Sequence, residues 1–267
     1  MKQISILGCG WLGMPLAENL IANNFIIKGS TTTELKLDKL KNLGIQPFLI
    51  VVNDNEIIGN IIKFLENSTI LIIDIPPKLR GLEKENFVNK IKTLLPFIKK
   101  STIKNVIFIS STSVYSDNTT IVTDAILPQP DTESGKQLLE VEQLLQNDND
   151  FNTTIVRFGG LIGDSRHPIR FLSGRKNIEN PNAPINLIHQ KDCIGILLKI
   201  IKMEFTNETF NAVTPYHPSR KEYYCQKALQ MGLALPEFNE SNPSIGKTIV
   251  SDKLERILEY HFLEKYL

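Results

Sequence analysis

Three glycines near the start of the chain have the spacing of a nucleotide-binding turn. Gly8, Gly10 and Gly13 form the pattern G-x-G-x-x-G between an apolar segment and an amphipathic one. In such a turn the first glycine permits a tight bend, the second leaves room for a pyrophosphate, and the third lets helix and strand approach closely. The N–H groups of Trp11 and Leu12 can then meet phosphate oxygens at the positive end of the helix. The pattern predicts a dinucleotide-binding site.

The residues after the second predicted strand bear on which dinucleotide is bound. An acidic side chain about 20 residues after the glycines normally binds the ribose hydroxyls of NAD. Here the segment contains Ser30, Thr31 and Thr32, and Lys36 follows one helical turn later. Hydroxyl and ammonium donors without an acid suit the 2′-phosphate of NADP, so we expect NADP, with NAD possible. The alternative is that these residues only begin and cap the next helix.

A second polar group follows a later apolar run. Residues 108–115 read Phe-Ile-Ser-Ser-Thr-Ser-Val-Tyr, which places Ser111 and Tyr115 at the carboxyl end of a predicted strand. The ends of parallel strands border the crevice in which ligands bind. Both residues are therefore candidate catalytic groups. The alternatives are that the Ser111 hydroxyl bonds its own backbone and that Tyr115 only packs.

Cations gather in a loop that follows another predicted strand. Arg166, His167 and Arg170 lie close together, and Arg175 and Lys176 come soon after. Guanidinium groups hold carboxylates and phosphates through paired hydrogen bonds, so Arg166, His167 and Arg170 are predicted to contact an anionic substrate. The alternative is a basic loop that faces water.

The elements that must position these groups alternate along the first 160 residues. Short apolar runs separated by amphipathic stretches are typical of a parallel sheet with helices on both faces. Strands are predicted at residues 3–7, 25–28, 46–51, 69–73, 105–110 and 154–158. The predicted fold class is α/β, a Rossmann-type doubly wound parallel sheet with a small C-terminal α/β lobe.

The chain divides into two unequal parts. Residues 1–163 are predicted to form the dinucleotide-binding Rossmann domain, and residues 164–267 a smaller substrate-side lobe that is not an independent domain. This second part is interrupted by proline, asparagine and arginine. Its predicted elements are helices at 191–203, 219–232 and 252–261 and a short strand near Phe210.

Composition and charge argue against several classes of protein. Of the 267 residues, 30 are basic and 29 acidic, so no net field favours nucleic acid or an anionic membrane. The three cysteines form no C-x-x-C pair and the histidines have no metal-ligand spacing, which predicts neither disulfides nor a metal site. With no apolar run of about 18 residues and no signal-peptide pattern, we expect a cytoplasmic protein that does not span a membrane.

Four segments together carry a resemblance to a known superfamily. They are the glycine turn, residues 108–115, residues 156–163 (Val-Arg-Phe-Gly-Gly-Leu-Ile-Gly) and residues 186–192 (Asn-Leu-Ile-His-Gln-Lys-Asp). In this order they resemble the extended short-chain dehydrogenase/reductase superfamily, its NAD-dependent epimerase/dehydratase group, and within that an atypical branch of YeeZ-like proteins.

The resemblance implies an active site of a Ser or Thr with a Tyr-x-x-x-Lys pair, in which lysine lowers the pKa of tyrosine. Ser111 matches the first position. Ser134 and Leu138 match the tyrosine and lysine positions, so both of those groups are missing. The resemblance also places His189 near the crevice, as a substrate contact or as a packed or capping residue.

One Tyr-x-x-x-Lys does occur, from Tyr223 to Lys227, in the C-terminal part of the chain. We interpret it as a coincidence on a helix face, because such four-residue patterns arise often in helices.

These features favour an NAD(P)-binding oxidoreductase or epimerase/dehydratase-like protein that acts on a small polar, anionic substrate. The alternative is a non-catalytic NAD(P)-responsive sensor or scaffold that kept the fold and lost the tyrosine and lysine, because fold alone does not decide function. The sequence gives no prediction of the oligomeric state.

Overall fold

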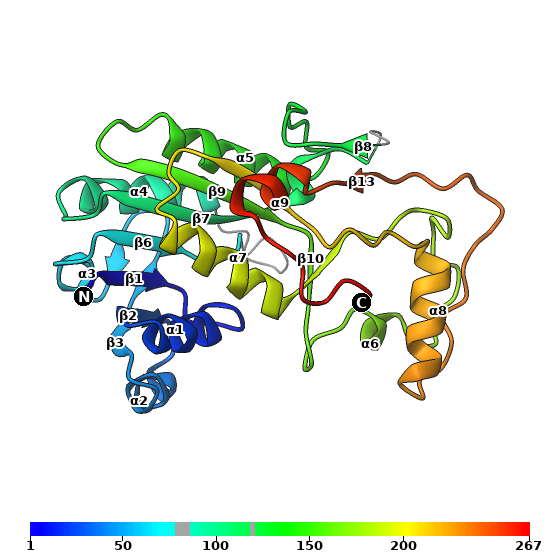
Figure 1. Ribbon diagram of the computed structural model, residues 1–267, viewed down its shortest axis with the longest axis horizontal. Helices are drawn as coiled ribbons and strands as arrows, with labels where there is room; N and C mark the ends of the chain where they lie inside the picture. The colour runs from blue at the N-terminus through cyan, green and yellow to red at the C-terminus, as the bar shows by residue number, and fades with distance from the viewer. Residues whose placement is uncertain (78–85, 118–120) are drawn as a thin grey trace.

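A seven-stranded parallel sheet forms the centre of the computed structural model, which describes residues 1–77, 86–117 and 121–267 (Figure 1). The strand order is β12-β9-β7-β6-β1-β2-β3. The strands are β1 Gln3–Leu7, β2 Ile26–Thr31, β3 Gln46–Leu49, β6 Ile70–Ile73, β7 Asn105–Ser111, β9 Asn152–Phe158 and β12 Thr209–Ala212. The order reverses between β1 and β6, and ligands of doubly wound sheets bind at the carboxyl ends of the strands at such a reversal.

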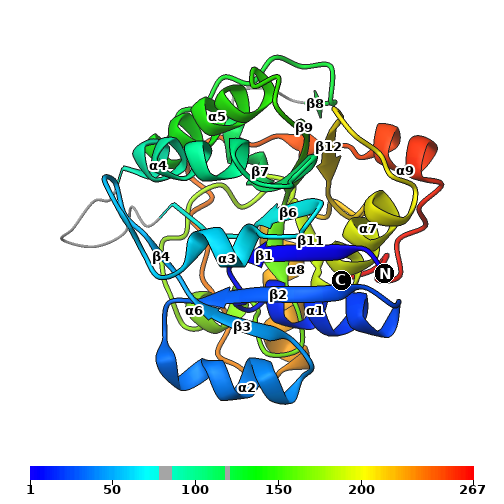
Figure 2. The ribbon, with the colours of Figure 1, turned by 90° about the vertical axis from the view of Figure 1, so that its left-hand side faces the viewer.

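Helices cover both faces of the sheet (Figure 2). On one face lie α1 Gly13–Ala22, α2 Leu37–Asn42, α7 Gln190–Lys202 and α9 Asp252–Leu258, and on the other α3 Ile61–Leu65, α4 Phe87–Lys99 and α5 Glu133–Gln146. All four residues of β6 are buried, which explains why its sequence is continuously apolar and does not alternate. The predicted fold class is confirmed.

Short strands and helices lie at the carboxyl edge of the sheet and in the C-terminal lobe. They are η1 Glu34–Lys36, β4 Val51–Val52, β5 Ile57–Ile58, η2 Thr112–Val114, β8 Ile121–Val122, β10 Gly160–Ile162, α6 Ile169–Leu172, β11 Leu187–His189, α8 Arg220–Gln230 and β13 Thr248–Ile249. β4 pairs with β5, β8 with β13 and β10 with β11.

Residues 164–267, which were predicted to form a lobe but not an independent domain, share the sheet and the core of residues 1–163. The edge strand β12 comes from beyond residue 163 and pairs with β9, and α7 and α9 pack into the same core as α1. A separate small core joins α6 to α8 around Ile169, Tyr223 and Tyr224. The lobe is therefore an elaboration of the sheet's carboxyl edge, and the Rossmann unit extends past residue 163.

Several element ends differ from the sequence prediction for local reasons. β2 continues to Thr31 because its pairing with β3 persists to that residue. β3 stops at Leu49, since Val51 turns into a separate antiparallel pair with Ile58. The last predicted helix ends at Leu258, because Glu259 adopts a left-handed conformation with φ of 46°.

Within the described residues, no helix is both long and apolar enough to cross a membrane.

Candidate functional site

The glycine turn connects β1 to α1, and its three glycines differ in what surrounds them. A Cβ atom at Gly8, where φ is 109°, would lie 2.3 Å from the carbonyl oxygen of Asp74, and one at Gly13 would lie 2.2 Å from the carbonyl oxygen of Gly8. A Cβ at Gly10 would have no heavy atom within 4 Å. The fold itself therefore requires two of the glycines, whereas Gly10 borders open space of the kind that a ligand phosphate needs.

The first turn of α1 presents unused hydrogen-bond donors beside Gly10. Leu12 stands at the N-cap position and provides no side-chain cap. Across the described parts of the chain, no backbone hydrogen bond involves the N–H of Trp11 or Leu12. Free N–H groups at a positive helix end bind anions, so the turn fits a dinucleotide pyrophosphate. The neighbouring Cys9 thiol is inert, because burial raises its pKa to about 12.

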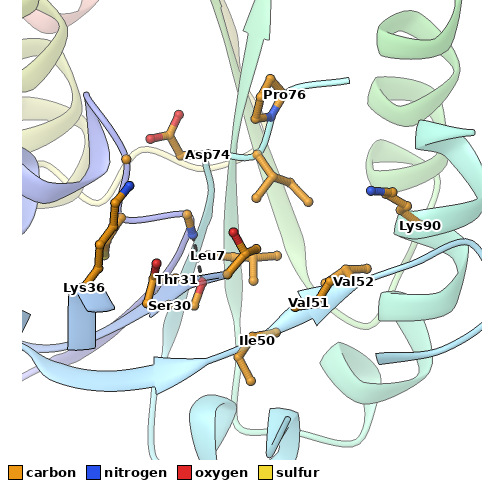
Figure 3. A pocket seen from close by; sticks show the side chains of 15 residues that line it. Leu7, Ser30, Thr31, Lys36, Ile50, Val51, Val52, Asp74, Pro76 and Lys90 are labelled. Carbon is orange, nitrogen blue, oxygen red and sulfur yellow. Dashed lines mark hydrogen bonds between the residues drawn. The ribbon is translucent and has the colours of Figure 1, made fainter. Parts of the chain in front are cut away.

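A cavity lies between the turn and the tip of β2 (Figure 3). We call it the tip cavity; it is lined by Leu7, Gly8, Cys9, Gly10, Ser30, Thr31, Thr32, Lys36, Ile50, Val51, Val52, Asp74, Ile75, Pro76 and Lys90. Ser30 is buried and its hydroxyl accepts a hydrogen bond from the Gly8 N–H, while the Thr31 hydroxyl accepts one from the Thr33 N–H. Of the residues that are predicted to bind the 2′-phosphate, Thr32 and Lys36 have exposed side chains.

A second cavity of about 360 Å³ lies on the other side of Gly10. This turn cavity is lined by Gly10, Trp11, Leu12, Asp74, Ile75, Pro76, Pro77, Ile109, Ser110, Ser111, Leu138, Leu161 and Arg166. It shares Gly10 and Asp74 with the tip cavity, so the two meet at the glycine turn. Leu138, at the position where the resemblance implies lysine, forms an apolar part of its wall. Ser134 lies in the first turn of the same helix, α5.

A third cavity of about 400 Å³ lies between the sheet edge and the C-terminal lobe. This lobe cavity is lined by Ser111, Thr112, Ser113, Tyr115, Asp117, Asp131, Thr132, Pro184, Ile185, Asn186, Leu187, Arg220, Tyr224 and Lys247. Ser111 lines both the turn cavity and the lobe cavity. Its hydroxyl oxygen accepts a hydrogen bond from the Ser113 N–H, at 3.1 Å, which leaves the hydroxyl proton available for donation.

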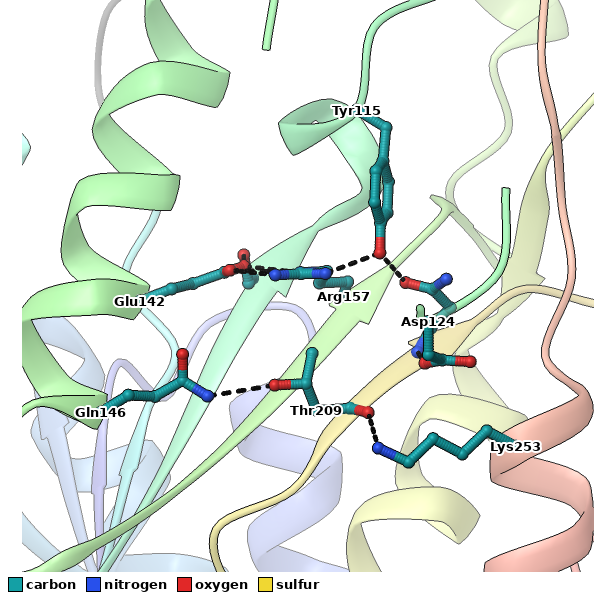
Figure 4. Close-up of polar contacts among 9 residues, drawn as sticks. Tyr115, Asp124, Glu142, Gln146, Arg157, Thr209 and Lys253 are labelled. Carbon is teal, nitrogen blue, oxygen red and sulfur yellow. Dashed lines mark hydrogen bonds and ion pairs between the residues drawn. The ribbon is translucent and has the colours of Figure 1, made fainter. Parts of the chain in front are cut away.

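The Tyr115 hydroxyl is directed into the protein interior (Figure 4). It donates to the Asn211 side-chain oxygen at 2.9 Å and accepts from the Arg157 guanidinium at 2.6 Å. Arg157 is in turn paired with the buried Glu142. Burial raises the pKa of Tyr115 despite the nearby arginine. The prediction of Tyr115 as a catalytic group is corrected accordingly, since its hydroxyl is committed to a buried network.

The structure places the two arginines that were predicted to bind substrate together, Arg166 and Arg170, in different surroundings. Both arginines are exposed, but the Arg166 guanidinium lies 5.0 Å from the centre of the Trp11 ring and lines the turn cavity, whereas Arg170 belongs to α6. Arg166 thus lies beside the glycine turn, and the two arginines do not form a joint anion clamp.

Both predicted histidine contacts have local structural partners. His167 Nε2 lies 2.9 Å from the Tyr223 hydroxyl, and its Nδ1 accepts the Ile169 N–H. Burial, then Lys227 and Arg170, lower the pKa of His167 to about 4, so the ring is neutral at pH 7. His189 caps α7 by accepting the N–H of the residue two positions later. These contacts support the packing and capping alternatives over substrate binding.

The Tyr223 and Lys227 pair belongs to the small core of the lobe. The Lys227 ammonium lies 5.9 Å from the centre of the Tyr223 ring, but burial raises the pKa of Tyr223 above its ordinary value. A catalytic tyrosine needs the opposite shift, so the interpretation of this pair as a coincidence agrees with the geometry.

Several charged residues that line the cavities were not predicted from the sequence, among them Asp74, Arg220 and Lys247. Asp74 directly follows the buried strand β6, and this strand-end position was a usable signal. Arg220 and Lys247 come from the C-terminal lobe, and no motif marks them. Lys247 is nearly buried and its ammonium lies 3.0 Å from an Asp117 carboxylate oxygen. Within the described residues, no group of three potential metal-ligating side chains gathers.

Comparison with solved structures defines the fold class of the protein. No family model matches the chain. UDP-glucuronic acid 4-epimerase from Bacillus cereus superimposes with a TM-score of 0.80 at 18% identity, over 97% of this chain and 93% of that chain. UDP-glucose 4-epimerase from Thermotoga maritima gives 0.80 at 16% identity, over 98% and 94%. The fold is that of the NAD-dependent epimerase/dehydratase group of short-chain dehydrogenases/reductases.

The family follows from sequence identity. Protein YeeZ of Escherichia coli strain K12 is 32% identical over 253 residues, which cover 94% of this chain and 92% of YeeZ. The chain belongs to the YeeZ family, and the resemblance found in the sequence is confirmed.

Proposed function

We propose that the protein binds NADP(H) along the tip and turn cavities and acts on a small polar, anionic substrate in the lobe cavity, as an oxidoreductase or epimerase/dehydratase-like enzyme. The main support is the position of Ser111, which lines the turn cavity on one side and the lobe cavity on the other. A hydroxyl at that junction can donate a hydrogen bond to a substrate oxygen that faces the cofactor. The Bacillus cereus epimerase was solved with UDP-glucuronic acid and NAD, a pair of ligands that suits two adjoining cavities.

The residues present fit a dinucleotide. Gly10, Trp11 and Leu12 would hold the pyrophosphate through backbone N–H groups, and the open space at Gly10 admits it. Thr32 and Lys36 would bind the 2′-phosphate at the tip cavity, where a cation favours the extra negative charge. When bound, the nicotinamide supplies hydride transfer, and the protein orients the substrate and stabilises its oxygen.

The lobe cavity provides the cations for an anionic substrate. Arg220 donates to the Glu179 carbonyl oxygen at 3.2 Å, and Lys247 donates to the Tyr115 carbonyl oxygen, so both side chains are held in place at the wall. Asp117 and Asp131 in the same wall can accept hydrogen bonds from sugar-like hydroxyls. We therefore assign substrate binding to Arg220 and Lys247 in place of the predicted Arg166 and Arg170.

A screen of anionic sugars and sugar nucleotides by thermal shift with NADPH present tests this assignment. A ligand that stabilises the wild type should lose about tenfold or more in affinity in Arg220→Ala, because a charge-assisted hydrogen bond is worth roughly 1.5–3 kcal/mol. Arg170→Ala is the matched control and should bind it unchanged. Equal losses in both variants, or stabilisation only by neutral compounds, would contradict the assignment.

A non-catalytic sensor remains the second candidate, and one observation favours it. Leu138 presents an apolar side chain where the resemblance implies the catalytic lysine, so the turn cavity lacks a cation at that place. Turnover of the screened ligand distinguishes the two: oxidation of NADPH, followed by absorbance, reports an oxidoreductase, and conversion of the ligand in the presence of NADP+, followed by chromatography, reports an epimerase or dehydratase, which regenerates its cofactor. Turnover that falls strongly in Ser111→Ala supports the enzyme, and ligand binding without turnover supports the sensor.

A further inference from the structure

Asp74 stands where the tip cavity and the turn cavity meet. Its backbone N–H bonds the Leu7 carbonyl oxygen at 2.9 Å, which fixes the residue beside the end of β1. The Gly13 N–H, at the start of α1, acts on its carboxylate and favours the ionised form. One carboxylate oxygen lies only 3.0 Å from the place that a Cβ at Gly13 would occupy. The chain thus places its own anionic group at the helix end that is expected to receive a phosphate (Figure 3).

The groups that face Asp74 come from several elements. Arg166, from the loop after β10, is the cation whose charge acts on the carboxylate, and the Gly13 N–H also stabilises the ionised form. Cys9 in the turn and Cys193 on α7 lie close enough to interact with it, but burial raises the pKa of both thiols, so both are neutral.

Among the described residues, two further cations line the tip cavity, to which Asp74 also belongs. They are Lys36, after β2, and Lys90, on α4. The balance still disfavours the carboxylate, since burial raises the pKa of Asp74 to about 7. At neutral pH the residue therefore exchanges readily between its two protonation states.

A dinucleotide would bring the two negative charges of its pyrophosphate to Gly10. The pyrophosphate and an ionised Asp74 would repel each other strongly at this short distance in a partly buried site. Because the carboxyl group is the weaker acid of the two, protonation of Asp74 removes the repulsion at the lowest free-energy cost. A protonated carboxyl group gains an O–H donor, and a hydrogen bond from it to a phosphate oxygen is charge-assisted.

We propose that Asp74 is a cofactor-binding residue that holds the dinucleotide pyrophosphate in its protonated form, so that binding takes up one proton from solution. This inference rests on the proposed function, because it requires the dinucleotide to bind at the glycine turn. It makes cofactor affinity fall as the pH rises through and above neutrality.

Calorimetric titration of the wild type with NADH, in two buffers of different ionisation enthalpy, measures the proton uptake. NADH is the probe because it lacks the 2′-phosphate, whose own ionisation near pH 6 would add to the signal. We expect uptake of close to one proton at pH 8.5 and close to none at pH 5.5, with the dissociation constant rising about tenfold per pH unit in the upper range.

Two variants separate this role from simple capping of α1. Asp74→Asn keeps the acceptor for the Gly13 N–H and is a permanent donor, so it should show no proton uptake and should bind NADH at pH 8.5 at least about tenfold more tightly than the wild type. Asp164→Asn, which removes an exposed charge from the same loop as Arg166, is the matched control and should behave as the wild type.

Two results would overturn the inference while leaving the proposed function intact. One is NADH binding by the wild type without proton uptake, which decides the matter even if Asp74→Asn does not fold. The other is a folded Asp74→Asn with the same pH dependence as the wild type, or with binding lost at every pH. Failure of the wild type to bind NADH or NADPH at any pH would overturn the proposed function as well.

Discussion

The glycine turn and the lobe cavity, which form the two ends of the proposed binding cleft, use different parts of the chain to bind a ligand. At the glycine turn the available donors are backbone N–H groups of residues 11 and 12, and the space beside them exists because Gly10 has no side chain. At the lobe cavity the polar groups are side chains, with Asp117, Arg220 and Lys247 contributed by three separate segments. One end therefore depends on the path of the main chain, and the other on the packing of the lobe against the sheet.

This difference predicts how each end responds to mutation. A backbone site tolerates no added volume at the turn itself. A side-chain site can lose one group and keep its shape, provided that its support remains. That support includes the buried network under Tyr115, whose carbonyl oxygen receives the Lys247 ammonium.

The largest expected effect on stability comes from breaking that network. Glu142 is fully buried and pairs with Arg157 through several hydrogen bonds. Glu142→Ala would leave a buried guanidinium without its counter-charge, which typically costs about 3–5 kcal/mol of unfolding free energy. Urea unfolding followed by circular dichroism measures it. Glu140→Ala, on the exposed face of the same helix, should cost under about 1 kcal/mol. A cost as small for Glu142 would show that the network does not support this end.

A smaller effect is expected at the tip cavity. Lys36 is exposed and would contact the 2′-phosphate together with Thr32. Lys36→Ala should weaken NADPH about tenfold, equivalent to about 1.4 kcal/mol, and should leave NADH nearly unchanged. Lys39→Ala, in the following helix, is the control and should affect neither. Equal loss of both dinucleotides in Lys36→Ala would mean that the lysine acts on the common part of the molecule, and the preference for NADP would be wrong.

The sequence predicts the backbone end of the cleft well because the main chain needs particular residue types there. Gly8 has a positive φ and Gly13 contacts the carbonyl of Gly8, so the motif and its geometry are one requirement. Continuous apolar runs such as Ile70–Ile73 likewise predict strands that are buried on both faces.

The side-chain end is not predictable from sequence in the same way. Arg220 lies on a helix whose sequence signals only its own capping box, and Lys247 lies in an extended segment without a motif. The proximity of both to Ser111 depends on how the lobe folds over the sheet edge. The spacing of the cations in the basic loop likewise does not reveal that Arg166 stacks on Trp11. This contact joins residues that lie more than 150 positions apart in the sequence.

The most direct test of dinucleotide binding at the glycine turn is calorimetric titration of wild type and Gly10→Val with NADPH, at a pH near 6 where Asp74 is protonated. A Cβ atom at this position meets no protein atom within 4 Å, so the variant should keep a melting temperature close to that of the wild type, yet its side chain occupies the space beside the free N–H groups. We expect binding by the wild type and a loss of at least about 100-fold in Gly10→Val, equivalent to about 2.7 kcal/mol. Undiminished binding by a folded Gly10→Val would contradict the account.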